Sequence, residues 1–329
     1  MTTRGFLLGK FMPPHAGHQL LCDVARSLSD ALTILVCSLE REPISGHLRH
    51  TWMSELYPDC RVLHLSRDMP QEPAEHPRFW DIWRDAVREL HPEPIDLVFA
   101  SEPYGHRLGA ELSARFVPVD PARLAVPISG TAVREDLLSA WSALAPPVRA
   151  HFARKVCLFG PESTGKTTLV TQLAQRFSTV GVPEYGRTYT DAFGVDCSAD
   201  DLIRIAKGQQ AMIASCARRS GPILFTDTDA VLTAVWATML TGERPAFFEQ
   251  DMELCSLYLL TDVDTPWVDD GTRYFPENAV RRQFFDACRS ELERRGAPYV
   301  VIRGSYAERL AAAEAAVEEA FPREVRAMR

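Results

Sequence analysis

The chain has 329 residues, of which 46% are hydrophobic and 24% charged, a composition typical of a globular protein with room for two domains. Its formal net charge of −8 excludes the broadly basic surface with which proteins neutralise nucleic-acid phosphates, so anionic ligands have to be bound at local sites. Eight scattered cysteines without a C-x-x-C pair indicate neither a disulfide framework nor a zinc site, and no apolar run reaches membrane-spanning length. We therefore expect a cytoplasmic protein with no nucleic-acid and no membrane partner.

The first half of the sequence alternates short apolar runs with segments of helical periodicity. Strands are predicted at 5–9, 32–37, 61–65, 96–100 and 115–119. Helices are predicted to begin near 15–18, to span 49–56 and 79–90, and to follow residue 128. This alternation of strands and helices predicts a parallel, doubly wound sheet.

Residues 141–154 interrupt the alternation with a Pro-Pro pair and divide the chain. A second alternation follows, with strands predicted near 156–159, 223–226, 257–261 and 299–302 and helices near 166–180, 200–219, 278–295 and 306–320. The sequence therefore predicts an α/β protein of two domains, 1–148 and 149–329, each a mainly parallel sheet flanked by helices.

The most specific motif opens the second half. The apolar run 156–159 leads into Gly160-x-x-x-x-Gly165-Lys166-Thr167 and then into a helical period, which is the strand–loop–helix order of a phosphate-binding loop. Lys166 is expected to contact the β- and γ-phosphates, and the Thr167 hydroxyl to hold Mg²⁺. The residues of this half that we expect to bind ATP are Gly160, Glu162, Ser163, Thr164, Gly165, Lys166, Thr167 and Thr168.

Two acidic residues of the second half follow apolar runs. Asp227 ends the predicted strand 223–226, as in a Walker B motif, and is predicted to bind Mg²⁺ together with Thr167. Glu184 lies where a strand-end carboxylate could take a proton from a substrate hydroxyl. A helix cap or a solvated charge is the alternative for each, and the sequence leaves open which of the two is the base.

A third segment of this half combines Trp267, Asp269, Asp270 and Arg273 around a glycine. The aromatic ring could stack on a substrate, the acids could bind ribose hydroxyls, and the arginine could act as a lid over the transferred phosphoryl group. An acidic turn with a partly buried tryptophan is the alternative interpretation.

In the first half, His15-x-x-His18 follows a strand and opens a helix, which places both imidazoles on one face of the first turn. Because helix N-termini favour anions, the pair could hold ATP phosphates and stabilise a departing pyrophosphate. Downstream, Ser129 or Thr131 can cap a helix on whose first turn Arg134 could bind phosphate. Alone, the histidines could also form a metal pair or simply cap the helix, and the arginine could lie at the surface.

Together these two motifs resemble the nucleotidylyltransferase superfamily, with its G-x-F-x-P-x-H-x-G-H and I-S-x-T-x-x-R patterns. The resemblance implies a Rossmann-like domain in which a substrate attacks the α-phosphate of ATP without a covalent enzyme intermediate. It also implies an ATP site formed by Gly9, Lys10, Phe11, His15, His18, Ser129, Thr131 and Arg134.

The order of all these motifs resembles the NadR-like family, bifunctional nicotinamide mononucleotide (NMN) adenylyltransferases and ribosylnicotinamide kinases. The resemblance implies that the P-loop half phosphorylates nicotinamide riboside with ATP to NMN, and that the first half adenylylates NMN with ATP to NAD and pyrophosphate, with Mg²⁺. It further implies catalytic roles for His15, His18, Arg134, Lys166, Glu184, Asp227 and Arg273. Substrate contacts are implied for Arg49, Trp83, Tyr185, Arg187, Trp267, Asp269 and Asp270, with Arg49 on the NMN phosphate and Trp83 on nicotinamide.

Two departures from the family pattern bear on function. Enteric members carry an N-terminal helix-turn-helix that represses transcription, whereas the first strand here is predicted from residue 5, so we expect no DNA binding. Pro183 stands where some relatives have an aromatic residue, which bears on riboside selectivity. A kinase with a vestigial transferase half and a regulator that binds NAD or ATP remain alternatives. The sequence leaves open whether the chain forms a homo-oligomer.

Overall fold

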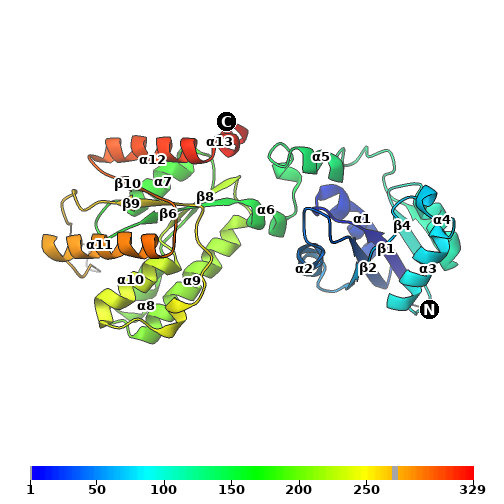
Figure 1. Ribbon diagram of the computed structural model, residues 1–329, viewed down its shortest axis with the longest axis horizontal. Helices are drawn as coiled ribbons and strands as arrows, with labels where there is room; N and C mark the ends of the chain where they lie inside the picture. The colour runs from blue at the N-terminus through cyan, green and yellow to red at the C-terminus, as the bar shows by residue number, and fades with distance from the viewer. Residues whose placement is uncertain (1, 269–272) are drawn as a thin grey trace. The chain divides into compact units, whose positions relative to one another are not determined.

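Two separate parallel sheets organise the chain in the computed structural model, which describes residues 2–268 and 273–329 (Figure 1). Each sheet belongs to its own unit, Met1–Val148 and Arg149–Arg329. The predicted fold class, two successive α/β domains with mainly parallel sheets, is confirmed.

The sheet of the first unit has the strand order β3-β2-β1-β4-β5. Its strands are β1 Arg4–Gly9, β2 Ala31–Ser38, β3 Arg61–Ser66, β4 Leu97–Ala100 and β5 Arg115–Pro118. All neighbours are parallel, with Phe6 in register with Thr33 on one side and Val98 on the other. The order reverses between β1 and β4, and ligands of such sheets bind beyond the carboxyl ends of the strands at this switch point.

Helices cover both faces of this sheet because its strands are apolar on both sides. One face, with Leu7 and Ile34, packs against α1 Ala16–Ser27 and α2 Gly46–Leu56. The other face, with Phe6 and Leu35, packs against α3 Phe79–Leu90 and α4 Tyr104–Leu112. The remaining elements are the 3₁₀ turns Pro73–Glu75 and Trp141–Ala143 and the helices α5 Gly130–Glu135 and α6 Pro146–Phe152.

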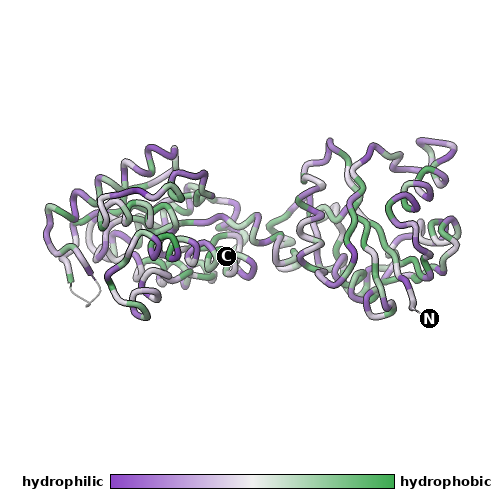
Figure 2. The backbone as a smooth tube through the Cα atoms, turned by 90° about the horizontal axis from the view of Figure 1, so that it is seen from below, coloured by the Kyte–Doolittle hydropathy of each residue, from purple (hydrophilic) through white to green (hydrophobic). Residues whose placement is uncertain are grey.

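The second sheet has the order β10-β9-β6-β8-β7, which places β6, the strand before the phosphate loop, at its centre. Its strands are β6 Arg154–Phe159, β7 Gly181–Val182, β8 Ile223–Asp227, β9 Leu257–Thr261 and β10 Tyr299–Ile302. Figure 2 shows apolar stretches running through the interior of the unit, as strands buried on both faces require.

Alternate residues of β6 face different helices. Val156 and Leu158 pack with α7 Lys166–Arg176, α12 Tyr306–Ala320 and α13 Pro322–Met328. Cys157 and Phe159 pack with α10 Ala230–Thr241 and α11 Asn278–Arg294 on the opposite face (Figure 1). The unit is completed by α8 Tyr185–Phe193, α9 Ala199–Ala217 and the 3₁₀ turn Ala246–Glu249.

The structure adds elements that the sequence patterns did not predict. These are α4, α6, α8, α10, α13 and the short strand β7. Helix α10 is the clearest case, since residues 230–235 are all buried and apolar residues surround its axis, so it lacks the one-sided period of a surface helix. Among the residues described, no helix combines the length and the apolar character needed to span a bilayer.

Candidate active sites

The phosphate loop of the second unit is shaped by backbone that only glycine tolerates. Gly160 has φ +134°, and a Cβ there would lie 2.8 Å from the backbone oxygen of Thr261 on the neighbouring strand. Gly165 has φ +83° and is the N-cap of α7. The loop therefore turns tightly from β6 into α7, with the N–H groups of the first helical turn free to meet an anion.

Lys166 and Thr167 lie at the start of α7, inside this loop. Lys166 is buried, and its Nζ donates to the Pro161 carbonyl at 2.8 Å, so its charge is held within the loop. The Thr167 hydroxyl donates to Oδ2 of Asp227, which ends β8. Oδ1 of Asp227 is buried without a hydrogen-bond partner among the described residues. A hydroxyl beside an unsatisfied carboxylate oxygen is a ligand pair that fits Mg²⁺.

Glu184 lines the cavity beside the phosphate loop, from the N-cap position of α8 just after β7. Burial, and then the nearby Asp227 carboxylate, raise the pKa of Glu184 to about 7. Burial also raises the pKa of Asp227, although Lys166, the Thr167 hydroxyl and Arg187 oppose the rise. A carboxyl group that titrates near neutrality, beside one that is engaged by Thr167, is suited to accept a proton.

The cavity around these groups encloses about 330 Å³. It is lined by residues 162–168 of the loop and its helix, by Glu184 and Arg187, and by Trp236 and Tyr274. The rings of Trp236 and Tyr274 have centroids 5.7 Å apart. The sequence patterns did not indicate either aromatic residue, because α10 was not predicted and the motif around Arg273 did not include Tyr274. The available signal was that each aromatic residue follows an acidic segment.

Glu162 fastens the loop to the segment that follows β9. Its buried carboxylate accepts the backbone N–H groups of Tyr274 at 2.9 Å and Phe275 at 2.7 Å. The Trp267 indole N–H also points to it, at 3.4 Å, and Trp267 is not among the residues that line the cavity. Arg273 donates to the Ser163 hydroxyl at 2.8 Å, which places its guanidinium on the phosphate loop. The candidate residues Asp269 and Asp270 lie outside the described residues.

Other candidates of this half have different surroundings. Thr164 is fully buried, and its hydroxyl contacts the Pro161 carbonyl at 2.8 Å and Thr261 at 2.7 Å, so its side chain supports the loop. Thr168 and Arg187 line the cavity, whereas the Tyr185 side chain lines a separate, more open depression. The structure therefore places Tyr185 away from the phosphate loop.

A buried trio near β6, Cys157, Asp229 and Cys255, has the composition of a metal site. Its carboxylate is already satisfied, because Asp229 caps α10 through the Leu232 N–H at 3.0 Å and accepts the Tyr258 hydroxyl at 2.7 Å. Burial also raises the pKa of the Cys157 thiol, which keeps it protonated. These hydrogen bonds make the trio part of the core.

In the first unit, His15 and His18 lie together at the start of α1, with ring centroids 3.8 Å apart. Nδ1 of His15 accepts the Gly17 N–H at 3.1 Å, so His15 caps the helix. Burial, Arg123 and Arg134 lower the pKa of His15 to about 4, and burial, His15 and the same arginines lower that of His18. Both imidazoles are therefore neutral at pH 7, and Nε2 of His15 and Nδ1 of His18 are buried without partners among the described residues.

The structure brings the segment 128–134 against these histidines. Ser129 caps α5 through the Ala132 N–H at 3.2 Å. Arg134 donates to the Met12 carbonyl at 3.1 Å and to the Thr131 hydroxyl at 3.0 Å. A Cβ on Gly130 would lie 3.2 Å from the Arg134 guanidinium and 3.8 Å from Nε2 of His15, so both motifs converge on one point.

Arg123 is a residue of this site that sequence reasoning did not assign. Its charge lowers the pKa of both histidines, and its backbone has φ +52°, a conformation that a non-glycine residue rarely adopts without support. Asp120 supplies that support, because its carboxylate accepts the N–H groups of Leu124, Ala125 and Val126. A basic residue in an Asp-Pro turn just before the 128–134 motif was the available signal.

The residues at and after the end of β1 contribute both to the surroundings of His18 and to a small pocket. Gly9 ends the strand, and the buried ring of Phe11 packs on His18 with centroids 5.0 Å apart. Lys10 forms an ion pair with Glu42 at 3.0 Å and lines the pocket together with Trp83. The Trp83 indole N–H donates to the Pro70 carbonyl at 2.9 Å, which fixes its ring there.

Arg49 differs from its expected role. Its side chain is completely buried, and its guanidinium donates to Glu42 at 2.6 Å, to the Lys10 carbonyl at 2.7 Å and to the Cys37 carbonyl at 3.3 Å. With its charge balanced by Glu42 and its donors directed at the protein, Arg49 offers no free guanidinium to an NMN phosphate. In this structure it organises the strand ends that carry Lys10.

Comparison with known proteins shows the family to which the chain belongs. A model described as "AAA domain" matches residues 155–309. The trifunctional NAD biosynthesis/regulator protein NadR of Escherichia coli strain K12 is 30% identical over 326 residues, covering 91% of this chain and 78% of the relative. A nicotinamide-nucleotide adenylyltransferase of Methanoculleus marisnigri is 28% identical over 163 residues, covering 47% of this chain and 92% of its own.

Solved structures agree with this at the level of the fold. A NadR protein in complex with NAD and AMP-PNP matches with a TM-score of 0.69 and 24% identity, covering 98% of this chain and 97% of its own. A NadR protein in complex with NR matches with a TM-score of 0.70 and 24% identity, covering 97% and 96%. By the identity and coverage of its Escherichia coli relative, the chain belongs to the NadR family of NAD biosynthesis proteins.

Proposed function

We propose that the chain is a two-site NAD salvage enzyme. Residues 149–329 would phosphorylate nicotinamide riboside with ATP to NMN, and residues 1–148 would adenylylate NMN with ATP to NAD and pyrophosphate. The observation that carries the proposal is that a helix suited to bind phosphate begins in each unit: α1, which follows His15, and α7, which begins with Lys166. Each has its own set of charged partners, so each supports its own ATP reaction.

The kinase assignment rests on the arrangement of a phosphate loop and two carboxylates. Lys166 would exchange the Pro161 carbonyl for a phosphate oxygen of ATP, and Arg273 would approach the same phosphates from Ser163. Mg²⁺, held by Thr167 and Asp227, supplies positive charge against the phosphate chain when bound. We assign the base to Glu184, because it titrates near pH 7 while Asp227 is engaged by the Thr167 hydroxyl.

The aromatic end of the cavity supports nicotinamide riboside as the acceptor. The nicotinamide ring of the riboside is a flat pyridinium cation, and aromatic faces attract such cations through their quadrupole. Trp236 and Tyr274 line the same cavity as Glu184 and would bind this ring. A NadR structure in complex with NR supports the same ligand for the family fold.

The transferase assignment rests on two neutral histidines and two nearby arginines that converge at the start of α1. His15 and His18 are neutral and present unpartnered ring nitrogens, while Arg123 and Arg134 supply positive charge close to them. These groups would bind the ATP phosphates while the NMN phosphate attacks the α-phosphorus and pyrophosphate leaves. The nicotinamide-nucleotide adenylyltransferase of Methanoculleus marisnigri, which matches 47% of the chain, supports the reaction.

The test is a product assay on the purified chain. Nicotinamide riboside with ATP and Mg²⁺ should give NMN, ADP, NAD and pyrophosphate, and NMN with ATP should give NAD and pyrophosphate, all followed by mass. Formation of NMN without NAD from either substrate would favour the kinase-only alternative. Binding of ATP and NAD without turnover of either substrate would favour the regulator.

A further inference from the structure

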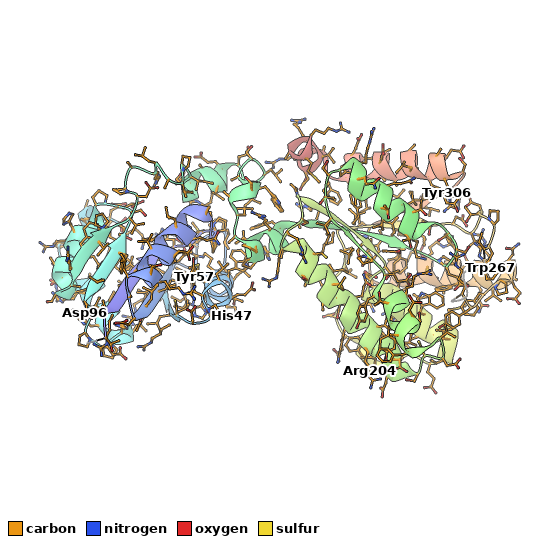
Figure 3. The ribbon with its side chains drawn as sticks, turned by 180° about the vertical axis from the view of Figure 1, so that it is seen from behind. His47, Tyr57, Asp96, Arg204, Trp267 and Tyr306 are labelled. Carbon is orange, nitrogen blue, oxygen red and sulfur yellow. The ribbon has the colours of Figure 1, made fainter. Side chains whose placement is uncertain are left out.

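The kinase cavity has an aromatic residue that the acceptor does not explain. Tyr306, the first residue of α12, lines the cavity and is 54% exposed. Its ring lies over the phosphate loop, because a Cβ on Gly165 would be 3.0 Å from the Tyr306 Cε1 atom. Figure 3 shows Tyr306 at the start of α12, at the same end of this unit as Trp267. We propose that the Tyr306 ring is the platform on which the base of the nucleoside triphosphate donor stacks.

The aromatic residues Tyr306 and Trp236, which both line the cavity, belong to helices on opposite faces of the sheet. Tyr306 belongs to α12, which packs with α7 over Val156 and Leu158. Trp236 belongs to α10, which packs with α11 over Cys157 and Phe159. A phosphate chain held in the loop therefore has one aromatic site on each side. Trp236 packs against the same cluster as Tyr189 of α8, the helix that Glu184 caps. The acceptor therefore belongs on the side of Glu184 and Trp236, and the donor nucleoside is left with the side of Tyr306.

The position of Tyr306 is held by a buried arginine three residues later. Arg309 has no exposed side-chain surface, and its guanidinium donates to the Thr164 carbonyl at 2.9 Å, the Gly304 carbonyl at 2.8 Å and the Asp262 carbonyl at 2.9 Å. These bonds join the first turn of α12 to the phosphate loop and to the end of β9. A capping box between Ser305 and Glu308 closes the same turn. These contacts therefore fix the start of α12, which carries the exposed Tyr306 ring, beside the phosphate loop.

A flat base is the ligand that suits such a ring. Base–aromatic stacking tolerates any base because each has a π-face, and alanine substitution of the aromatic partner typically reduces affinity by about 5- to 150-fold. The platform would therefore strengthen binding of the donor without selecting among purines. Tyr306→Phe keeps the ring and should keep the affinity.

The inference rests on the proposed kinase function, and the test separates the two. Tyr306→Ala should raise the KM for ATP in the ADP-forming reaction by about 5- to 150-fold, with the KM for nicotinamide riboside within about twofold. Tyr306→Phe should restore the KM for ATP, and the pyrophosphate-forming reaction should not change. Phe193→Ala removes another exposed aromatic of the same unit, outside this cavity, and is the matched control.

Direct binding makes the result independent of the acceptor. In the full chain, the component of Mg·AMP-PNP binding that Lys166→Ala removes is binding at the kinase site. Tyr306→Ala should weaken this component. Binding of inorganic triphosphate, which has no base, should not change. If riboside phosphorylation is absent, this titration still decides the role of Tyr306. Unchanged AMP-PNP affinity, or an equal loss for triphosphate, would overturn the proposal, and so would a rise in the KM for riboside alone.

Discussion

Replacing Glu184 with Gln should stabilise the second unit at alkaline pH while it abolishes riboside phosphorylation. The folded protein raises the pKa of Glu184 from 4.5 to about 7, chiefly by burial and then by Asp227. Between these values the folded chain binds more protons than the unfolded chain, so this group makes stability fall as pH rises through that range. A rise from 4.5 to about 7 corresponds to an upper limit of about 3 kcal/mol.

The assay is calorimetric unfolding of wild type and Glu184→Gln at pH 5 and pH 8, with the transition of the second unit identified by its shift on adding nicotinamide riboside, which is proposed to bind that unit alone. The unfolding free energy of the variant minus that of wild type should be about 1–3 kcal/mol larger at pH 8 than at pH 5. For a unit of this size, this corresponds to roughly 2–10 °C in Tm. Glu243→Gln, at an exposed glutamate of the same unit, should show no such change.

Kinetics of the same variant complete the test. Wild-type kinase turnover should rise as the pH passes through about 7, because Glu184 ionises there. The variant should not show this rise, and its turnover should be about 10²–10⁴-fold lower. A stability difference that does not depend on pH, or that favours wild type at pH 8, would refute the charge argument. A variant with wild-type turnover would remove Glu184 from the role of base.

Three further predictions concern the separate sites. Lys166→Ala should abolish ADP formation from riboside and leave adenylylation of NMN largely intact; equal loss of both in a folded variant would contradict two independent sites. His18→Ala should lower adenylylation turnover by about 10²–10³-fold, more than it weakens ATP binding, with the kinase unaffected. A rate within about threefold of wild type, measured as pyrophosphate release, would place His18 outside the chemistry. The chain, with a net charge of −8, should not bind duplex DNA specifically, and tight, salt-sensitive binding to a promoter fragment in a gel-shift titration would contradict this.

Local motifs were predictable because their chemistry is contiguous in the sequence. The glycine loop 160–167 and the His15–His18 turn each follow a strand and open a helix, so a few neighbouring residues specify their local structure. The fold class followed from the alternation of strand and helix periods.

Contacts between distant segments were not predictable from these patterns. Arg309 donates to Thr164, which lies 145 residues earlier, and nothing in the spacing of either residue indicates the contact. Arg49 matched a family position, yet its burial beside Glu42 depends on how α2 packs against the strand ends. Helix α10, with Trp236, was missed because a helix that is apolar all round has no one-sided period to detect.

The carboxylate of Glu162 has a thermodynamic consequence for how the two substrates influence each other's binding. It joins the phosphate loop to the backbone of Tyr274 and Phe275, so any displacement of the loop by ATP is transmitted to a wall of the acceptor site. Two ligands that bias one shared element have a coupling free energy, and that coupling is reciprocal. The affinity for riboside should therefore depend on whether the loop holds ATP or ADP, and the nucleotide affinity should change by the same factor when riboside binds.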